Sequence, residues 1–148
     1  MRPPAILRPY SPDDAPACLA IWRRASEAGH PFLTSEDLDA DAALVRDVYL
    51  PAAAITVAEF AGRPAGFVAL LDRLIGGLFV DPDHHRRGIG AALVASLGDA
   101  ALDVEVYARN NPARAFYAAQ GFRETSCRLV DDRGRDEPLV CMTRAARA

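Results

Sequence analysis

The stretch that decides the fold is DPDHHRRGIGAALV, residues 81–94, in which two histidines and two arginines stand directly before Gly88-Ile89-Gly90. The residues after Gly88 have the apolar spacing of a helix, and a helix start carries partial positive charge that favours acidic neighbours. Four basic side chains at a helix start are unfavourable unless an anion is bound there, so they indicate an anionic ligand. Glycines let another group approach the backbone, and a helix start leaves unpaired N–H groups. Together these features predict a phosphate site; the alternative is a glycine turn with solvated arginines.

Two common phosphate-binding motifs are absent from the sequence. It contains neither the Walker-type pattern GxxxxGK[ST] nor the dinucleotide pattern GxGxxG. The sequence therefore supports neither a P-loop nucleotide site nor a dinucleotide-binding fold.

Length and composition predict a single globular domain over residues 1–148. The chain has 51% hydrophobic and 25% charged residues and a formal net charge of −3. This acidic balance argues against a nucleic-acid partner. Three cysteines without CxxC spacing predict free thiols in a cytoplasmic protein, with no disulfide frame and no metal site. We expect no signal peptide and no membrane partner, because the best apolar stretch, 50–71, is interrupted by charges and a proline.

Periodicity along the chain predicts four helices and seven strands. The helices are expected at 11–29, within 30–50 behind a Thr34 or Ser35 cap, from 89 to about 101, and at 110–120. The strands are expected at 6–7, 54–60, 65–71, 74–80, 102–108, 122–130 and 137–143. This order predicts an α/β fold with a mixed, mostly antiparallel, twisted sheet of six to seven strands and about four helices on its faces.

Two segments resemble the signatures of the GNAT family, the Gcn5-related N-acetyltransferases. GLFVDPDHHRRGIGAALV is similar to the acyl-CoA-binding segment, whose pattern is [QR]-x-x-G-x-[GA]. Gly88 and Gly90 fill the two small positions, and His85 stands where the family usually has Gln or Arg. NNPARAFYAAQGF is similar to the second signature, N-x-x-A-x-x-F-Y-x-x-x-G-F. The residues in register with it are Asn110, Ala113, Phe116, Tyr117, Gly121 and Phe122.

The resemblance also extends beyond the two signatures. The element order matches the GNAT fold over nearly the whole chain, which implies the acyl-CoA N-acyltransferase fold. IWRRASEAGHPFL and VDDRGRDEPL, at 21–33 and 130–139, resemble the small stand-alone bacterial acetyltransferases of this family.

The resemblance implies how acetyl-CoA is bound as co-substrate, without a metal. Backbone amides of 86–91 would hold the pyrophosphate, and the pantetheine arm would pair with the edge of the strand at 74–80 where it splays from the strand at 102–108. Gly76 and Gly77 fit a bulge in that strand, or a plain bend. The expected cofactor-binding residues are Leu78, Phe79, Val80, His85, Arg86, Arg87, Gly88, Ile89, Gly90, Ala91, Asn110 and Tyr117.

The resemblance further implies direct attack of an amine on the thioester, so the cysteines have no covalent role. Backbone N–H near Val80 would polarise the thioester oxygen. Tyr117 is expected to give the departing thiolate a proton, as a tyrosine at this position does in the family. The alternative for Tyr117 is an aromatic side chain that anchors the short helix.

The attacking amine must also lose a proton. A free lysine amine has a pKa of about 10.4, so its deprotonation at pH 7 costs on the order of 4–5 kcal/mol. A base or a water wire must accept that proton. His30 is the preferred base, because it lies in the loop after the first helix, where GNAT substrates often enter. The other candidates by residue type are Glu59, Asp72 and Glu105.

The sequence thus predicts an acetyl-CoA-dependent N-acetyltransferase for a primary amine of a small molecule or a protein. The alternative is a non-catalytic acyl-CoA-binding module that acts as a sensor or regulator, because the strand at 74–80 carries no carboxylate and His85 departs from the family pattern. A third hypothesis, a toxin that acetylates aminoacyl-tRNA, fits poorly with the acidic net charge. We expect a monomer or a homodimer, with Cys127 and the last strands as a possible dimer edge.

Overall fold

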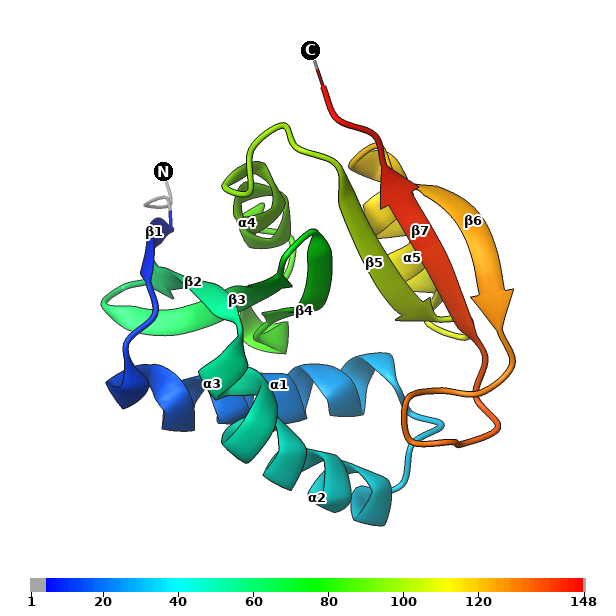
Figure 1. The fold of residues 1–148 in the computed structure, drawn as a ribbon. Coiled ribbons are helices and arrows are strands. Elements are labelled where there is room, and N and C mark those ends of the chain that lie inside the picture. The colour runs from blue at the N-terminus through cyan, green and yellow to red at the C-terminus, as the bar shows by residue number, and fades with distance from the viewer. Residues whose placement is uncertain (1–4, 148) are drawn as a thin grey trace.

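One twisted sheet of seven strands forms the centre of the protein, in the order β1-β2-β3-β4-β5-β7-β6 (Figure 1). The structure is a computed structural model that describes residues 5–147, so the expected domain of 1–148 extends beyond the described residues at both ends. The strands are β1 (Ile6–Pro9), β2 (Ala54–Phe60), β3 (Arg63–Leu71), β4 (Leu74–Val80), β5 (Leu102–Tyr107), β6 (Arg123–Arg128) and β7 (Leu139–Arg144). Only β4 and β5 pair in parallel, which confirms the mixed, mostly antiparallel sheet.

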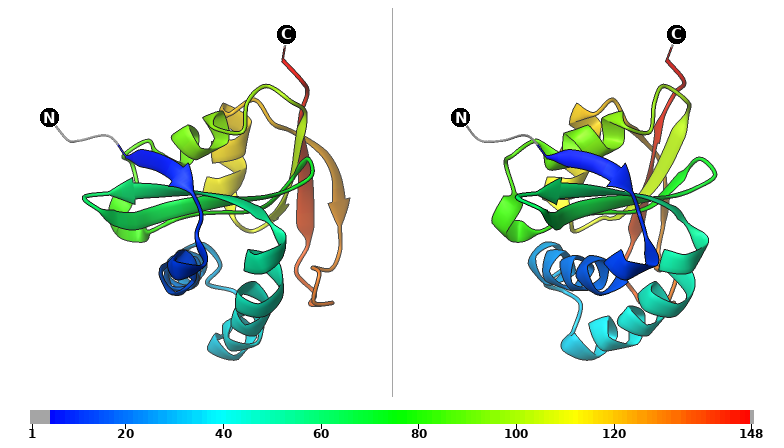
Figure 2. Two further views of the ribbon diagram at one scale, coloured as in Figure 1. Left: turned by 60° about the vertical axis from the view of Figure 1, so that its left-hand side comes forward. Right: turned by 90° about the vertical axis from the view of Figure 1, so that its left-hand side faces the viewer.

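The helices cover both faces of this sheet. Figure 2 shows α1 and α2 on one side of the strands and α4 and α5 on the other. The helices are α1 (Ala15–Gly29), α2 (Ser35–Leu44), α3 (Leu50–Ala52), α4 (Ile89–Ala95) and α5 (Asn111–Ala119). Short 3-10 turns, Pro12–Asp14 and Pro82–His84, precede α1 and α4. A π-helical turn, Val45–Tyr49, joins α2 to α3.

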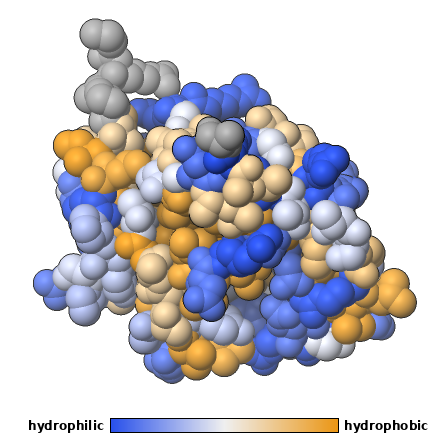
Figure 3. Space-filling model, turned by 45° about the horizontal axis from the view of Figure 1, so that its top comes forward, coloured by the Kyte–Doolittle hydropathy of each residue, from blue (hydrophilic) through white to orange (hydrophobic). Residues whose placement is uncertain are grey.

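The two faces of the sheet carry separate apolar clusters. Trp22 and Ile21 of α1 pack on Phe67 in the cluster beneath α1 and α2. Leu93 of α4 and Tyr117 of α5 belong to the cluster on the opposite face. On the face seen in Figure 3, hydrophobic patches are separated by hydrophilic residues, as on surfaces that contact water. The sheet therefore joins two cores and has a helical layer on each side.

Local signals account for most element boundaries. Thr34, rather than Ser35, caps α2: its Oγ1 accepts a hydrogen bond from the Asp37 amide at 3.0 Å, and the Asp37 carboxylate accepts one from the Thr34 amide at 3.0 Å. Asn110 caps α5, since its Oδ1 accepts from the Ala113 amide at 3.2 Å. Asx and Thr side chains satisfy free amides at helix starts in this way.

The expected helix from 89 to about 101 is wrong at its end. α4 stops at Ala95, and the Ser96 hydroxyl donates to the Leu93 carbonyl at 2.6 Å. Gly98 follows with φ +79°, a left-handed conformation that ends a helix. The remaining residues form a loop into β5. The helix after Thr34 also runs past its expected end, through the π-helical turn to Ala52.

β4 and β5 pair over a very short length. Their register contains only Leu74 opposite Asp103 and Ile75 opposite Val104. In the β3–β4 ladder, Ala69 pairs with Gly77 and Leu70 with Ile75, which leaves Gly76 in a bulge. A bulge bends its strand and increases its twist. β4 therefore separates from β5 after Ile75, which confirms the predicted bulge and the predicted splaying.

Arg8 fastens the start of the chain to the sheet. Its guanidinium donates to both carboxylate oxygens of Asp14, at 2.7 and 2.8 Å, and to Glu59 of β2 at 2.6 Å. The Asp14 carboxylate also accepts from the Ser11 amide at 2.8 Å. The hydrogen bonds from Arg8 hold the pKa of Asp14 below its usual value, although burial opposes the shift. Asp14 thus links β1 to the entry of α1.

We predict that Asp14→Asn lowers the free energy of unfolding at pH 7 by on the order of 1–3 kcal/mol. Because the folded-state pKa is lowered, the carboxylate stabilises the fold fully above its unfolded pKa of about 3.9. This stabilisation is lost as the pH falls through the folded value. Urea unfolding at pH 7 and at steps below pH 4 should show the difference from wild type shrinking. Asp13→Asn, at an exposed neighbour, is the control; an equal loss there would contradict the prediction.

Candidate active site

A cleft of about 1300 Å³ opens where β4 and β5 separate. Its walls come from β4, β5, the end of α1, α2 with the π-helical turn, the starts of α4 and α5, and the loop between β6 and β7. These elements are far apart in the chain and meet at the break in the sheet (Figure 1). Because β4 has no β5 residue opposite it beyond Ile75, the backbone N–H and C=O groups on that edge are open to an extended ligand.

The glycine turn forms one end of the cleft. Gly88 has φ +76°, and Arg86 two residues earlier has φ +64°. A side chain at position 88 would be strained in this left-handed conformation, and glycine also has no side chain that could cap the amides that follow. The N–H groups of this turn are therefore available to an anion, as the sequence predicts.

The basic residues before the glycine divide into two groups. His84, His85 and Arg86 line the cleft. Arg87 does not, because its guanidinium lies over the Phe60 ring, 4.4 Å from the ring centroid. The direction of Arg87 depends on a ring from β2, which no local pattern reveals.

The two acidic residues of this segment are neutralised from α1. Arg24 donates to Asp81 and to Asp83, each at 2.8 Å. These contacts tie the segment before the glycine turn to α1. They also offset the negative charge beside the basic residues, so this end of the cleft remains suited to an anion.

Asn110 and His30 meet in the cleft wall. The Asn110 Nδ2 group lies 3.1 Å from His30 Nε2, while Asn110 Oδ1 accepts from the Ala113 amide. Burial lowers the pKa of His30 to about 4, so the ring is neutral at pH 7. Since an amide nitrogen can only donate, His30 Nε2 accepts this hydrogen bond and the ring proton is on Nδ1. The structure therefore joins two residues singled out from the sequence.

Tyr117 lies further along α5, with its ring against Phe116 and Phe122. Its side chain lines the cleft and is otherwise buried in the apolar cluster under α4 and α5. Burial raises the pKa of the Tyr117 phenol above its ordinary value. A phenol is protonated at neutral pH even without this shift, so Tyr117 carries a proton, and the raised pKa makes it a weaker acid than a free tyrosine.

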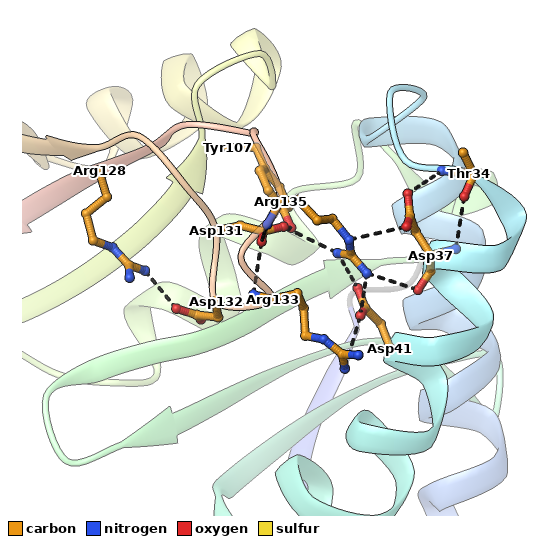
Figure 4. A network of polar contacts seen from close by, with 9 residues as sticks. All are labelled: Thr34, Asp37, Asp41, Tyr107, Arg128, Asp131, Asp132, Arg133 and Arg135. Atoms are coloured by element: carbon orange, nitrogen blue, oxygen red, sulfur yellow. Dashed lines mark hydrogen bonds and ion pairs between the residues drawn. The ribbon is translucent and has the colours of Figure 1, made fainter.

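The opposite end of the cleft is built by a polar network between α2 and the β6–β7 loop (Figure 4). The Asp131 carboxylate accepts from the Tyr107 hydroxyl at 2.7 Å and from the Arg133 and Arg135 amides, each at 2.9 Å. Arg135 reaches across to α2, where it contacts Asp41 at 2.8 Å and Asp37 at 3.3 Å. The network therefore holds the loop against α2.

This end of the cleft has an excess of negative charge. In its ion pairs, six carboxylates meet four guanidinium groups. The carboxylates are Asp37, Asp41, Glu105, Asp131, Asp132 and Glu137, and the guanidinium groups are Arg109, Arg128, Arg133 and Arg135. The spacing of the acidic residues within DDRGRD gives no signal of these contacts, since Arg135 and Asp41 are 94 positions apart.

The four base candidates lie in different places. Glu105 and His30 line the cleft, and the Glu105 carboxylate pairs with Arg128 at 2.6 Å. Glu59 is paired with Arg8 outside the cleft lining, and Asp72 lies in the turn between β3 and β4. Of the four base candidates, only Glu105 and His30 therefore lie where they could contact a ligand in the cleft.

The cleft gathers most of the residues expected to bind the cofactor. Eleven of the twelve line it, and Arg87 is the exception. The eleven are Leu78, Phe79, Val80, His85, Arg86, Gly88, Ile89, Gly90, Ala91, Asn110 and Tyr117.

The described residues, 5–147, offer neither a cluster of metal-ligating side chains nor a membrane-spanning helix. In this range, no three His, Cys, Asp or Glu side chains are grouped so that they could hold a metal ion. No helix of the described residues has the length and apolarity needed to span a membrane.

Comparison with known proteins gives matches to sequences and to structures. The family model "Acetyltransferase (GNAT) domain" matches residues 51–124. The peptidyl-lysine N-acetyltransferase YiaC of Escherichia coli is 37% identical over 130 residues, which cover 86% of this chain and 89% of YiaC. The peptidyl-lysine N-acetyltransferase YjaB of Salmonella typhimurium is 38% identical over 125 residues, which cover 82% and 86%.

A solved structure agrees with the sequence matches. The apo-form solution structure of YjaB from Escherichia coli superposes with a TM-score of 0.85 at 32% identity, covering 97% of this chain and 99% of that one. The family model fits the segment from the end of α3 to β6, which contains both the glycine turn and Tyr117. The chain therefore belongs to the GNAT family and is an acetyl-CoA-dependent N-acetyltransferase.

Proposed function

We propose that this enzyme transfers the acetyl group to the side-chain amine of lysine residues in proteins. The observation that carries the proposal is the separation of charge along the cleft, with His85 and Arg86 at one end and an excess of carboxylates at the other. The basic end suits a polyanionic carrier, and the acidic end suits a lysine ammonium group. YiaC and YjaB, both named as peptidyl-lysine N-acetyltransferases, support the same substrate class.

The cleft fits acetyl-CoA, which supplies the acetyl group as a reactive thioester. The amides of the turn at 86–91 would bind the diphosphate, with His85 and Arg86 beside it. The free edge of β4 from Gly76 to Val80 would pair with the amide groups of the pantetheine arm. Leu78 and Phe79 line this part of the cleft and exclude water around the thioester.

Two side chains would handle the protons of the reaction. Tyr117, whose phenol is protonated at neutral pH, would donate to the departing sulfur; because burial raises its pKa and makes it a weaker acid, this transfer depends on the position of the hydroxyl beside the sulfur. Glu105 would accept the proton of the amine, directly or through one water, because its carboxylate lines the acidic end. His30 is the weaker base, since its pKa is about 4 and its Nε2 already accepts from Asn110.

The free thiols and the edge strand of the protein bear on its cellular compartment and its oligomeric state. Cys18, Cys127 and Cys141 are free thiols, which supports a reducing compartment such as the cytoplasm. β6 is an exposed edge strand, which leaves a monomer or a homodimer as the proposed state.

A panel of acceptors tests the proposal. CoA release and mass spectrometry would be compared for an Nα-blocked peptide with one lysine, the same peptide with norleucine in place of lysine, a peptide with only a free α-amine, free lysine and aminoacyl-tRNA. We expect acetylation of the lysine peptide alone at a substantial rate. Preferred turnover of free lysine, the α-amine or aminoacyl-tRNA would overturn the substrate class. Tight acetyl-CoA binding with no turnover of any acceptor would favour a non-catalytic acyl-CoA-binding module.

We predict that Gly88→Val raises the Kd for acetyl-CoA at least tenfold, because the side chain blocks the turn amides. Gly62→Val is a matched control: Gly62 has φ +78° and, like Gly88, has open space where a Cβ would lie, but it is in the β2–β3 turn outside the cleft lining. Both variants should lose about 1–2 kcal/mol of stability through strain. Calorimetric titration with acetyl-CoA measures the affinity, and equal weakening in both variants would contradict the prediction.

We predict that Tyr117→Phe and Glu105→Gln each lower kcat by roughly 10²–10⁴-fold, the usual contribution of a positioned acid or base. The Kd for acetyl-CoA should stay within about threefold, since neither proton transfer takes place in the binary complex. Tyr10→Phe and Glu27→Gln are controls outside the cleft lining. Steady-state kinetics with the lysine peptide measure the effect, and a near-normal kcat in either cleft variant removes that residue from the mechanism.

A further inference from the structure

We infer that His30 is a positioning residue, which acts on the reaction by holding the Asn110 amide at the start of α5. The inference rests on the acetyltransferase activity but not on the identity of the acceptor. Its test therefore uses acetyl-CoA binding and the coupling between two residues, both of which are independent of the proposed lysine substrate.

The oxygen and the nitrogen of the Asn110 side-chain amide each make a different hydrogen bond. Its Oδ1 caps α5 through the Ala113 amide at 3.2 Å, and its Nδ2 donates to His30 Nε2 at 3.1 Å. The Ala113 amide fixes Oδ1 toward the helix, so Nδ2 faces the ring, and a neutral His30 with its proton on Nδ1 adds a hydrogen bond to this orientation. His30 thus favours the one orientation of Asn110 in which the oxygen is free to cap the helix.

The His30 ring is itself held on several sides. It contacts the Tyr107 ring edge-on with centroids 4.8 Å apart, and the Phe32 ring at 5.6 Å. Tyr107 is fixed in turn by its hydroxyl, which donates to Asp131 at 2.7 Å. At Gly29, an added Cβ would lie 3.3 Å from Asn110 Nδ2, so glycine leaves room for this close approach to the end of α1. These contacts leave the imidazole little freedom to turn toward a substrate.

The protonation state of His30 agrees with this role. Burial lowers the pKa to about 4, so the Nε2 lone pair is present throughout the neutral range. Neutral imidazole has a single accepting nitrogen, and Asn110 occupies it. Accepting a proton from a substrate amine would break this contact and charge a buried ring. Across the neutral pH range, the neutral His30 ring therefore offers Asn110 Nδ2 a nitrogen to which it can donate.

The effect reaches the chemistry along α5. Asn110 and Tyr117 are seven residues apart, about two helical turns, so both lie on the side of α5 that lines the cleft. When the cap is secure, the first turn of the helix is fixed and Tyr117 has a constant direction. Without the hydrogen bond to His30, the Asn110 side-chain amide could rotate by half a turn, and the first turn of α5 would be held less firmly.

A double-mutant cycle between His30 and Asn110 tests the inference. We expect His30→Ala to lower kcat/KM for acetyl-CoA and to raise its Kd, each by about three- to tenfold, which corresponds to one lost hydrogen bond. In the Asn110→Ala background the same change should have no further effect. Multiplying effects in the double variant would overturn the inference.

His30→Gln separates positioning from base catalysis. The glutamine oxygen can accept from Asn110 Nδ2 but cannot act as a base near pH 7. We expect it to restore at least half of the activity lost in His30→Ala, with an unchanged pH–rate profile in both variants. A glutamine variant as inactive as the alanine variant, or loss of one limb of the profile, would identify His30 as the base and overturn the positioning role.

Phe32→Leu is the matched control for loosened packing. Phe32 touches the His30 and Tyr107 rings but has no hydrogen bond to Asn110. Its effect on kcat/KM should multiply with that of Asn110→Ala, and the Asn110 side-chain amide resonances should move in His30→Ala but not in Phe32→Leu. Urea unfolding verifies that each variant is folded. If His30→Ala does not fold, His30→Phe, which keeps an aromatic ring but cannot accept a hydrogen bond from Asn110, replaces it in the wild-type and Asn110→Ala backgrounds.

Discussion

Two residue pairs hold the middle of the sheet together: Leu74 with Asp103, and Ile75 with Val104. On one side of this junction β1–β4 form an antiparallel meander, and on the other side β5, β7 and β6 form a second antiparallel unit. The bulge at Gly76 turns β4 away immediately after the junction. The sheet is thereby continuous at one end and open at the other. The cleft, the free strand edge and the position of the glycine turn all depend on this short pairing.

The two ends of the cleft acquire their charge in different ways. At the basic end, the positive residues come from one continuous segment, and Arg24 of α1 neutralises the acidic residues beside them. At the acidic end, the carboxylates come from α2, β5 and the β6–β7 loop, which are brought together only by folding. One end of the site is thus encoded locally, while the other is assembled from distant parts of the chain.

This difference explains which parts of the molecule could be predicted from the sequence. The glycine turn and a helix start at Asn110 or Asn111 have clear local signals, and the element order is readable from periodicity, whereas Tyr117 is singled out by the resemblance of its segment to the second GNAT signature. The Arg135–Asp41 contact could not be predicted, because its partners are 94 residues apart and either could equally be solvated. The direction of Arg87 depends on Phe60 of β2, and the contact of His30 with Asn110 depends on how α1 meets α5. Side-chain direction across elements is a tertiary property, so local patterns do not determine it.

The ion pairs of Arg135 with Asp37 and Asp41 of α2 affect the order in which parts of the protein fold. A contact that spans 94 residues closes a long loop of chain, and its entropic cost is recovered only after the strands between the partners have paired. We therefore expect the contacts between α2 and the β6–β7 loop to be among the last to form during folding. By the same reasoning this region opens at a lower free energy than the strands at the centre, and its amides exchange hydrogen with solvent sooner. The region next to the acidic end of the cleft is thus the region that can loosen without unfolding the rest.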